Sequence, residues 1–158
     1  MKVRKQIPIC FPDKSIKGYQ ESELAQSETN DCMVRATAAA FDVHYDQAHA
    51  FCAQHFYRKF RKGSFGVYYK LKEMEADGLK IFKKKIKSIM PCTYYKVYGK
   101  EIQRSMTVGT FAIRYSKGTY LLLVKGHAFT IKDGEVAGGN YDDGYRLRRR
   151  VEFAWKVA

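Results

Sequence analysis

The sequence has little proline, few acidic residues and no long apolar run. Its 158 residues include 3 Pro, and 16 Asp and Glu stand against 29 Lys and Arg. Apolar stretches such as Tyr120–Val124 are far shorter than the roughly eighteen residues that a membrane span needs, so we expect no transmembrane helix. Pro8 and Pro12 interrupt the basic start before an apolar signal segment can form, and we therefore expect the protein to act where it is made.

Cysteine is also sparse, and its spacing excludes two common uses. The four cysteines, at positions 10, 32, 52 and 92, form no Cys-x-x-Cys pair and lack the density of a disulfide-stapled secreted domain. We expect free thiols in a reducing compartment. Cys10, Cys52 and Cys92 are interpreted as structural, because cysteine is among the most frequently buried residues.

The composition predicts a single domain that spans residues 1–158, with an irregular N-terminal extension over residues 1–23. Apolar residues make up 46% of the chain and aromatic residues 15%, which is sufficient for one sizeable core. No repeat, low-complexity segment or Pro/Gly/Ser-rich linker divides the sequence.

The net charge of +13 is large for a chain of this size and favours an anionic partner, either nucleic acid or an acidic protein. Any one basic cluster can also be an ordinary solvated face. The clusters lie at Arg58, Lys59, Arg61 and Lys62, at Lys83, Lys84, Lys85 and Lys87, and at Arg146, Arg148, Arg149 and Arg150.

Helical patterns dominate the part of the chain that follows residue 30. Asn30 and Asp31 are good N-cap residues, and the alanine-rich run behind them predicts a helix that begins near Cys32. A second helical pattern begins at Asp46, and a third covers Val67–Ala76.

Strand patterns dominate the second half of the chain. Asp133 and Gly134 form a strong two-residue hairpin signal, and Thr107 caps a short amphipathic segment, Val108–Tyr115. The predicted strands are Leu79–Lys83, Met90–Tyr98, Tyr120–Val124, His127–Lys132, Glu135–Ala137 and Val151–Trp155. Helices followed by an antiparallel sheet predict an α+β fold, with the last long strands packed on the Cys32 helix.

A nucleophilic thiol is the chemistry that this arrangement favours. The first turn of a helix stabilises a thiolate through unpaired N–H groups and the positive end of the helix dipole, and Cys32 is predicted to lie there. His127, at the head of a strand, is the candidate general base, and Asn140 or Asp142 would hold its second ring nitrogen. This order of cysteine, histidine and polar residue is typical of papain-type enzymes.

Three segments carry a resemblance to a known family. Asn30–Ala36 at the helix start, Gly118–Tyr120 and Gly126–Gly134 resemble the small papain-like, double-glycine-peptidase-like cysteine peptidases of bacteria and their phages. The resemblance covers roughly residues 24–145. It implies a papain-like fold and a cysteine peptidase, located in the bacterial cytoplasm or associated with the virion if a phage encodes it.

The resemblance also implies roles for further residues. Gln26 lies six positions before Cys32, where the family places the glutamine that completes the oxyanion hole with the Cys32 backbone N–H. Asn140 matches the third residue of papain relatives and Asp142 that of the double-glycine peptidases, and we prefer Asn140. Met33 replaces the tryptophan that commonly follows the catalytic cysteine in papain relatives.

Two functions from different classes remain open. The first is thiol-dependent cleavage of a peptide or isopeptide bond in a protein substrate, without a cofactor. The second is a basic, virion-associated or nucleic-acid-binding protein that kept the fold with little or no activity. His49, Cys52 and His55 share a predicted helix face, but a packed cluster is a better interpretation than a metal site, because no further ligand pair accompanies them.

Overall fold

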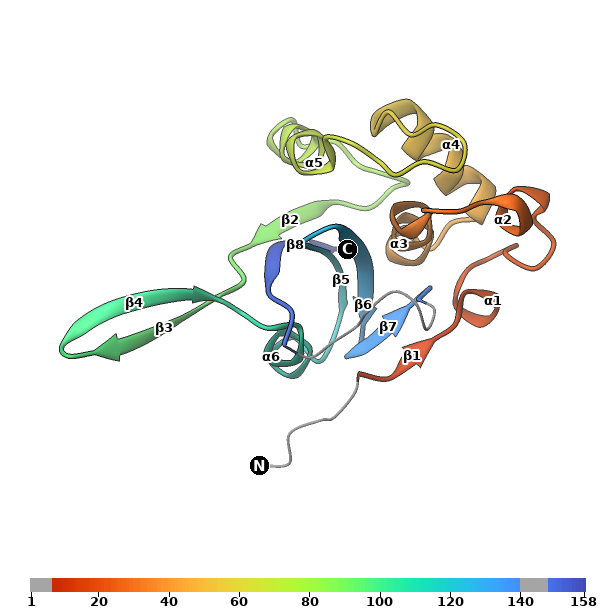
Figure 1. Ribbon diagram of the computed structural model, residues 1–158. Helices are drawn as coiled ribbons and strands as arrows, with labels where there is room; N and C mark the ends of the chain where they lie inside the picture. The colour runs from red at the N-terminus through yellow and green to blue at the C-terminus, as the bar shows by residue number, and fades with distance from the viewer. Residues whose placement is uncertain (1–6, 140–147) are drawn as a thin grey trace.

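Helices and strands occupy most of the chain in the computed structural model, which describes residues 7–139 and 148–158 (Figure 1). The helices are α1 (Pro12–Ser15), α2 (Glu23–Ser27), α3 (Cys32–Phe41), α4 (Tyr45–His55), α5 (Val67–Ala76) and α6 (Val108–Arg114). The strands are β1 (Ile9–Cys10), β2 (Ile86–Ile89), β3 (Cys92–Val97), β4 (Lys100–Ser105), β5 (Thr119–Val124), β6 (His127–Lys132), β7 (Glu135–Ala137) and β8 (Val151–Val157).

The main sheet has the order β1-β7-β6-β5-β8-β2. Its pairs are antiparallel except for β1 with β7, which are parallel. Helices combined with a mostly antiparallel sheet confirm the α+β prediction at the level of class. β5, β6 and β8 lie in this one sheet, as the strand patterns predicted.

Both faces of the sheet are covered, and the alternation of side chains explains how. Leu121, Ala128 and Trp155 point toward the layer of α3, α4 and α5, whereas Leu122 and Phe129 point toward α6. A strand buried on both faces reads as a continuous apolar run, which is why Tyr120–Val124 shows no alternation in sequence. Figure 1 shows α6 on the side of the sheet away from α3.

The α3 helix is joined to the centre of the sheet by packing and by one buried hydrogen bond. The Thr130 hydroxyl in β6 donates to the carbonyl oxygen of Ala36 over 2.7 Å. The small side chains of α3, among them Ala36 and Ala40, are almost fully buried and allow close approach to β6. The position of Cys32 is therefore set relative to β6 by a rigid contact.

Several predicted elements differ from the structure. Leu79–Lys83 is not a strand, because Phe82 and Lys83 both take positive φ and make a tight turn between Ile81 and Lys84. The N-terminal region contains β1 and α1 and buries Ile7 and Ile16, so the prediction of an irregular extension over residues 1–23 was wrong in part.

The segment Met90–Tyr98 also differs from its prediction. It contains β3, but this strand pairs with β4 in a separate two-stranded sheet and is mostly exposed, so it is not the half-buried strand that was expected. Within residues 7–139 and 148–158, none of the helices combines the length and apolarity that a membrane span requires.

Candidate active site

Cys32 is the first residue of α3 and is partly buried. The chain turns sharply before it, because Asn30 has a φ of 52°. Asp31 occupies the N-cap position, but its side chain makes no capping hydrogen bond, so the predicted Asp31 cap is wrong in this detail. The placement of Cys32 in the first helical turn is confirmed, and this is where a helix favours negative charge.

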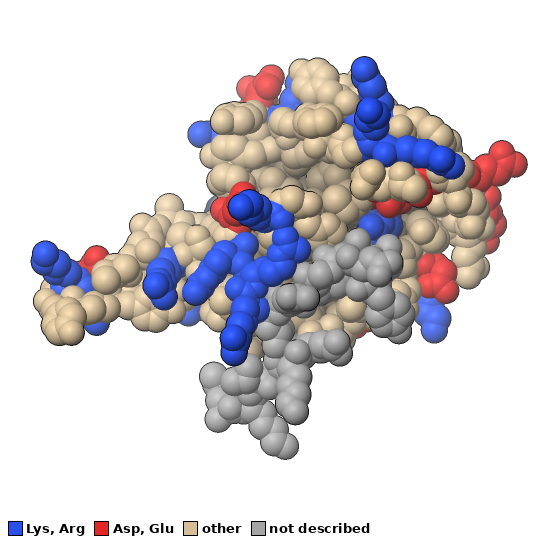
Figure 2. Space-filling view, in the orientation of Figure 1, with Lys and Arg blue, Asp and Glu red and all other residues tan. Residues whose placement is uncertain are grey.

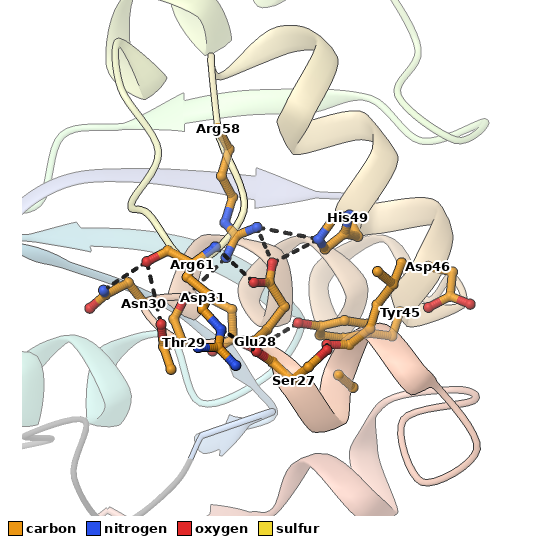
Figure 3. A network of polar contacts seen from close by, with 12 residues as sticks. Ser27, Glu28, Thr29, Asn30, Asp31, Tyr45, Asp46, His49, Arg58 and Arg61 are labelled. Carbon is orange, nitrogen blue, oxygen red and sulfur yellow. Dashed lines mark hydrogen bonds and ion pairs between the residues drawn. The ribbon is translucent and has the colours of Figure 1, made fainter.

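A polar network centred on the buried Glu28–Arg58 ion pair holds the loop that leads to Cys32 (Figure 3). The Glu28 carboxylate accepts hydrogen bonds from Arg58 and His49, the latter over 2.7 Å, and from the Arg61 backbone N–H over 2.9 Å. The Asn30 amide donates to the carbonyl oxygen of Arg61 over 3.1 Å. The segment after α4 is thereby fastened to the residues immediately before Cys32.

The ion pair at the centre of this network is fully removed from solvent. The side chains of Glu28 and Arg58 are 0% and 1% exposed. Burial alone would raise the pKa of Glu28, but hydrogen bonds from Arg58, Arg61 and His49 outweigh it, and that pKa lies below its ordinary value. The sequence placed Arg58 in a basic cluster that was either a solvated face or part of a surface for an anionic partner. The structure corrects this for Arg58, whose side chain is buried against Glu28.

A second buried chain of polar contacts begins at Asp31. Its carboxylate accepts from Arg35 Nε over 3.2 Å and from the Tyr45 hydroxyl over 2.7 Å. Burial, together with the nearby Asp31 carboxylate, raises the pKa of Tyr45 far above its usual range. Arg35 Nη1 donates in turn to the carbonyl oxygen of Gly138 over 2.9 Å, which ties the start of α3 to the chain beyond β7.

His127 is the first residue of β6 and follows the turn residue Gly126, which has a φ of 72°. It pairs with Val124, and its ring stacks on that of Phe129 with centroids 5.6 Å apart. Because side chains alternate along a strand, His127 belongs to the same face of the sheet as Phe129, whereas Ala128 and Thr130 point toward α3. The register of β5 with β8 shifts between Leu123 and Val124, next to the pair that contains His127.

Cys32 and His127 line one groove of about 410 Å³. The groove passes around the end of the sheet, because its wall includes Leu123 and Ala128 from the α3 face as well as Val124 and His127. Its remaining lining comes mainly from the segment before and within α5 and from β8: Gly63, Ser64, Gly66, Val67, Tyr68, Tyr69, Glu152 and Phe153. The stacked rings of Tyr68 and Phe153, with centroids 3.9 Å apart, form an apolar wall.

The other predicted site residues are not brought into this groove. Gln26 lies on α2 with an exposed side chain that donates to the carbonyl oxygen of Gln20 over 3.5 Å, and it is not part of the groove lining. Asn140 and Asp142 lie outside the described residues. The groove therefore contains two of the residues that the sequence singled out, and the role of a third residue remains a prediction.

The remaining cysteines and histidines have separate surroundings. All four cysteines are free thiols, as predicted. Cys52 is buried beside Thr37, and burial raises its pKa to about 12. His49 contacts Glu28, whereas His55 packs on Phe51. In the part of the chain that the structure describes, no group of three His, Cys, Asp or Glu side chains could hold a metal ion.

Sequence reasoning missed the Glu28 network, whereas Cys32 and His127, which it singled out, line one groove. A single signal was present for the network: Glu28 is an acidic residue shortly before the helix start, while Arg58 lies in a basic run. Glu28 meets Arg58 because of the path that the chain takes after α4, and hydrophobic periodicity in the sequence does not predict that path.

No family model matches this sequence, no curated protein matches it, and no solved structure matches the fold. The assignment of the groove therefore depends on its residues and their geometry.

Proposed function

We propose that this chain is a papain-like cysteine peptidase with Cys32 as nucleophile and His127 as general base. The observation that carries the proposal is that both residues line one groove, with Cys32 in the first turn of α3 and His127 at the start of β6. The proposed substrate is a peptide or isopeptide bond in a protein that lies along this groove.

The proposed reaction has two steps. The Cys32 sulfur attacks the carbonyl carbon as His127 takes up the thiol proton, and the C–N bond breaks as His127 returns that proton to the leaving amine. Water then attacks the thioester with His127 as base, which releases the acid and regenerates the thiol. The N–H groups of the first helical turn are suited to stabilise the developing oxyanion.

The alternation of side chains places His127 on the face of the sheet that carries Phe129, whereas Cys32 packs on the opposite face. The proposal therefore requires the His127 ring to reach Cys32 around the end of the sheet. Two features support this reach. His127 is the terminal residue of its strand, beside Gly126, and the register shift at Leu123/Val124 adds local twist at this end of the sheet. The groove itself is lined by residues from both faces of the sheet.

The test is covalent labelling of Cys32 with a peptidyl epoxide probe, followed by mass spectrometry of the intact protein and its peptides. We expect selective labelling at Cys32 that falls at least about 100-fold in His127→Ala, since a positioned base contributes about that much. His55→Ala, a half-buried histidine outside the groove, is the matched control and should label normally. Equal labelling rates in His127→Ala and the wild type would contradict the dyad.

Further variants test the assisting residues. If Gln26 donates to the oxyanion, it must first leave the carbonyl of Gln20, and Gln26→Ala should lower turnover about 10²–10³-fold. For the third residue, iodoacetamide alkylation of Cys32 is followed across pH in Asn140→Ala and Asp142→Asn. An upward shift of the alkylation profile that occurs only in Asp142→Asn would favour Asp142 over Asn140, because a carboxylate also stabilises the imidazolium.

A further inference from the structure

The β3–β4 hairpin projects from the body of the molecule as an arm (Figure 1). Its two strands pair with each other over their full length and form a sheet of their own. The connecting residues, Tyr98 and Gly99, have φ values of 51° and 76°, as the favoured two-residue hairpin turn requires. Every residue of β4 is exposed, so the arm contributes little to the core.

The arm presents apolar and aromatic groups to solvent. The register pairs Tyr95 with Ile102, which places both side chains on one face of the arm, and a hollow of about 500 Å³ lies there. Tyr95 is 49% exposed and Tyr94 is 58% exposed, while Tyr98 at the tip is fully exposed. A connection between β2 and α6 does not require exposed rings, and exposed apolar groups gathered in this way mark an interaction surface.

Positive charge runs along the same arm. Lys100 and Arg104 lie on the same face as Tyr95 and Ile102, whereas Lys96 lies on the other face, opposite Glu101. Within residues 7–139 and 148–158 no ion pair engages Lys100 or Arg104. At the base of the arm, Arg150 Nη1 donates to the carbonyl oxygen of Ser105 over 2.7 Å. Figure 2 shows Lys and Arg side chains along the arm and on the adjoining body.

The positive charge continues onto the sheet that carries the arm. Lys87 in β2 and Lys156 in β8 are direct cross-strand partners, and both are exposed. Like charges in directly opposed positions destabilise a sheet unless a counter-charge neutralises them. A bound anion would therefore stabilise the strand that leads into the arm.

We propose that the β3–β4 arm binds single-stranded nucleic acid. Bases stack on the exposed rings of Tyr95 and Tyr98, and the phosphates contact Lys100 and Arg104, which share the face of Tyr95. The combination of unpaired cations with interleaved exposed aromatic rings is what single-strand binding uses, because every base offers a ring face. An acidic protein would complement the charge but would leave the rings without a planar partner. This inference is independent of the peptidase proposal.

The test is fluorescence anisotropy with labelled single-stranded DNA and RNA of about 20 nucleotides, across salt concentrations of about 50 to 200 mM. We expect Lys100→Gln/Arg104→Gln to weaken binding at least about tenfold. The slope of log K against log salt should fall by about 1.4, because each of the two lost phosphate contacts of a single strand contributes about 0.7.

A matched control separates a specific surface from net charge. Lys59→Gln/Lys62→Gln removes the same charge from exposed positions outside the arm and should leave most of the affinity. Equal weakening in the two double variants would overturn the proposal, as would an absence of binding by the wild type.

The stacking component has its own variant, Tyr95→Thr/Tyr98→Asn. Threonine suits a strand, and asparagine tolerates the positive φ before Gly99, so the ribbon should persist. We expect about a tenfold or greater loss of single-strand affinity with an unchanged salt slope. Unchanged affinity in this variant, tighter binding of duplex DNA than of single strands, or equal displacement by poly-glutamate would each overturn the assignment to single strands.

Discussion

Replacement of Arg58 by methionine tests whether the buried network supports the loop before Cys32. Methionine keeps an unbranched side chain of similar reach but removes the guanidinium that bonds to Glu28. Since the Glu28 carboxylate is 0% exposed, the variant leaves a buried charge with His49 and the Arg61 N–H as its remaining partners.

The expected loss of stability follows from that burial. Removal of one partner of a buried ion pair costs about 3–5 kcal/mol, because the remaining charge stays desolvated. We expect the low end of the range, about 3 kcal/mol, since two hydrogen bonds to Glu28 persist. For a chain of this size, a loss of this magnitude lowers the melting temperature by about 6–12 °C.

The penalty of the same variant should depend on pH. In the wild type the folded-state pKa of Glu28 lies below its ordinary value, so this group stabilises the fold above about pH 4.3, and the contribution is lost as pH falls through the folded pKa. Without the hydrogen bond and the charge of Arg58, which lower it, the folded-state pKa of Glu28 should rise. Acidification should then reduce the difference in stability between Arg58→Met and the wild type.

The assay is urea unfolding followed by Trp155 fluorescence at several pH values. Lys59→Gln, one residue away and exposed, is the control and should change stability by less than about 0.5 kcal/mol. Glu28→Gln/Arg58→Met removes both charges and should be more stable than Arg58→Met alone. An Arg58→Met protein as stable as the control, or a penalty that grows on acidification, would refute the reasoning.

Three further substitutions or labelling experiments probe the frame around the groove. Gly138→Ala should cost about 1–3 kcal/mol in thermal unfolding, because φ is +77° and the new Cβ would lie 2.9 Å from Ile16 Cδ1. Unchanged stability would contradict the positive φ and close packing of Gly138. Thr130→Val should cost about 1–3 kcal/mol in urea unfolding, since the buried Ala36 carbonyl loses its 2.7 Å donor, and an unchanged midpoint would argue against that contact. Cys52, with its pKa raised to about 12, should resist iodoacetamide at pH 8 until the protein unfolds, and rapid native alkylation would disprove its burial.

Short-range patterns predicted the elements around the groove well. Helical periodicity located α3 and reproduced α5 at Val67–Ala76. The Asp133–Gly134 turn and the strands on either side of it also match, because a two-residue turn with positive φ is encoded locally. The prediction failed at Leu79–Lys83, where β-type composition was overridden by two residues with positive φ.

The sequence could not predict which of the strands would be covered by another layer of the fold. The residues of β3 have the composition of a half-buried strand, yet the strand belongs to the exposed arm, because burial depends on whether another layer covers the strand. Tyr95 in β3 and Lys100 and Arg104 in β4 form no cluster in sequence; the pairing of β3 with β4 places them on one face of the arm.

By itself, the sequence determined the class of fold, the helix that begins at Cys32 and the strand that begins at His127, because caps, turns and periodicity act over a few residues. Only the tertiary structure decided that Cys32 and His127 line one groove, that Glu28 meets Arg58 in a buried pair, and that β3 and β4 leave the main sheet. Each of these depends on contacts between segments far apart in the chain, and such contacts are selected by the packing of whole layers rather than by local preference.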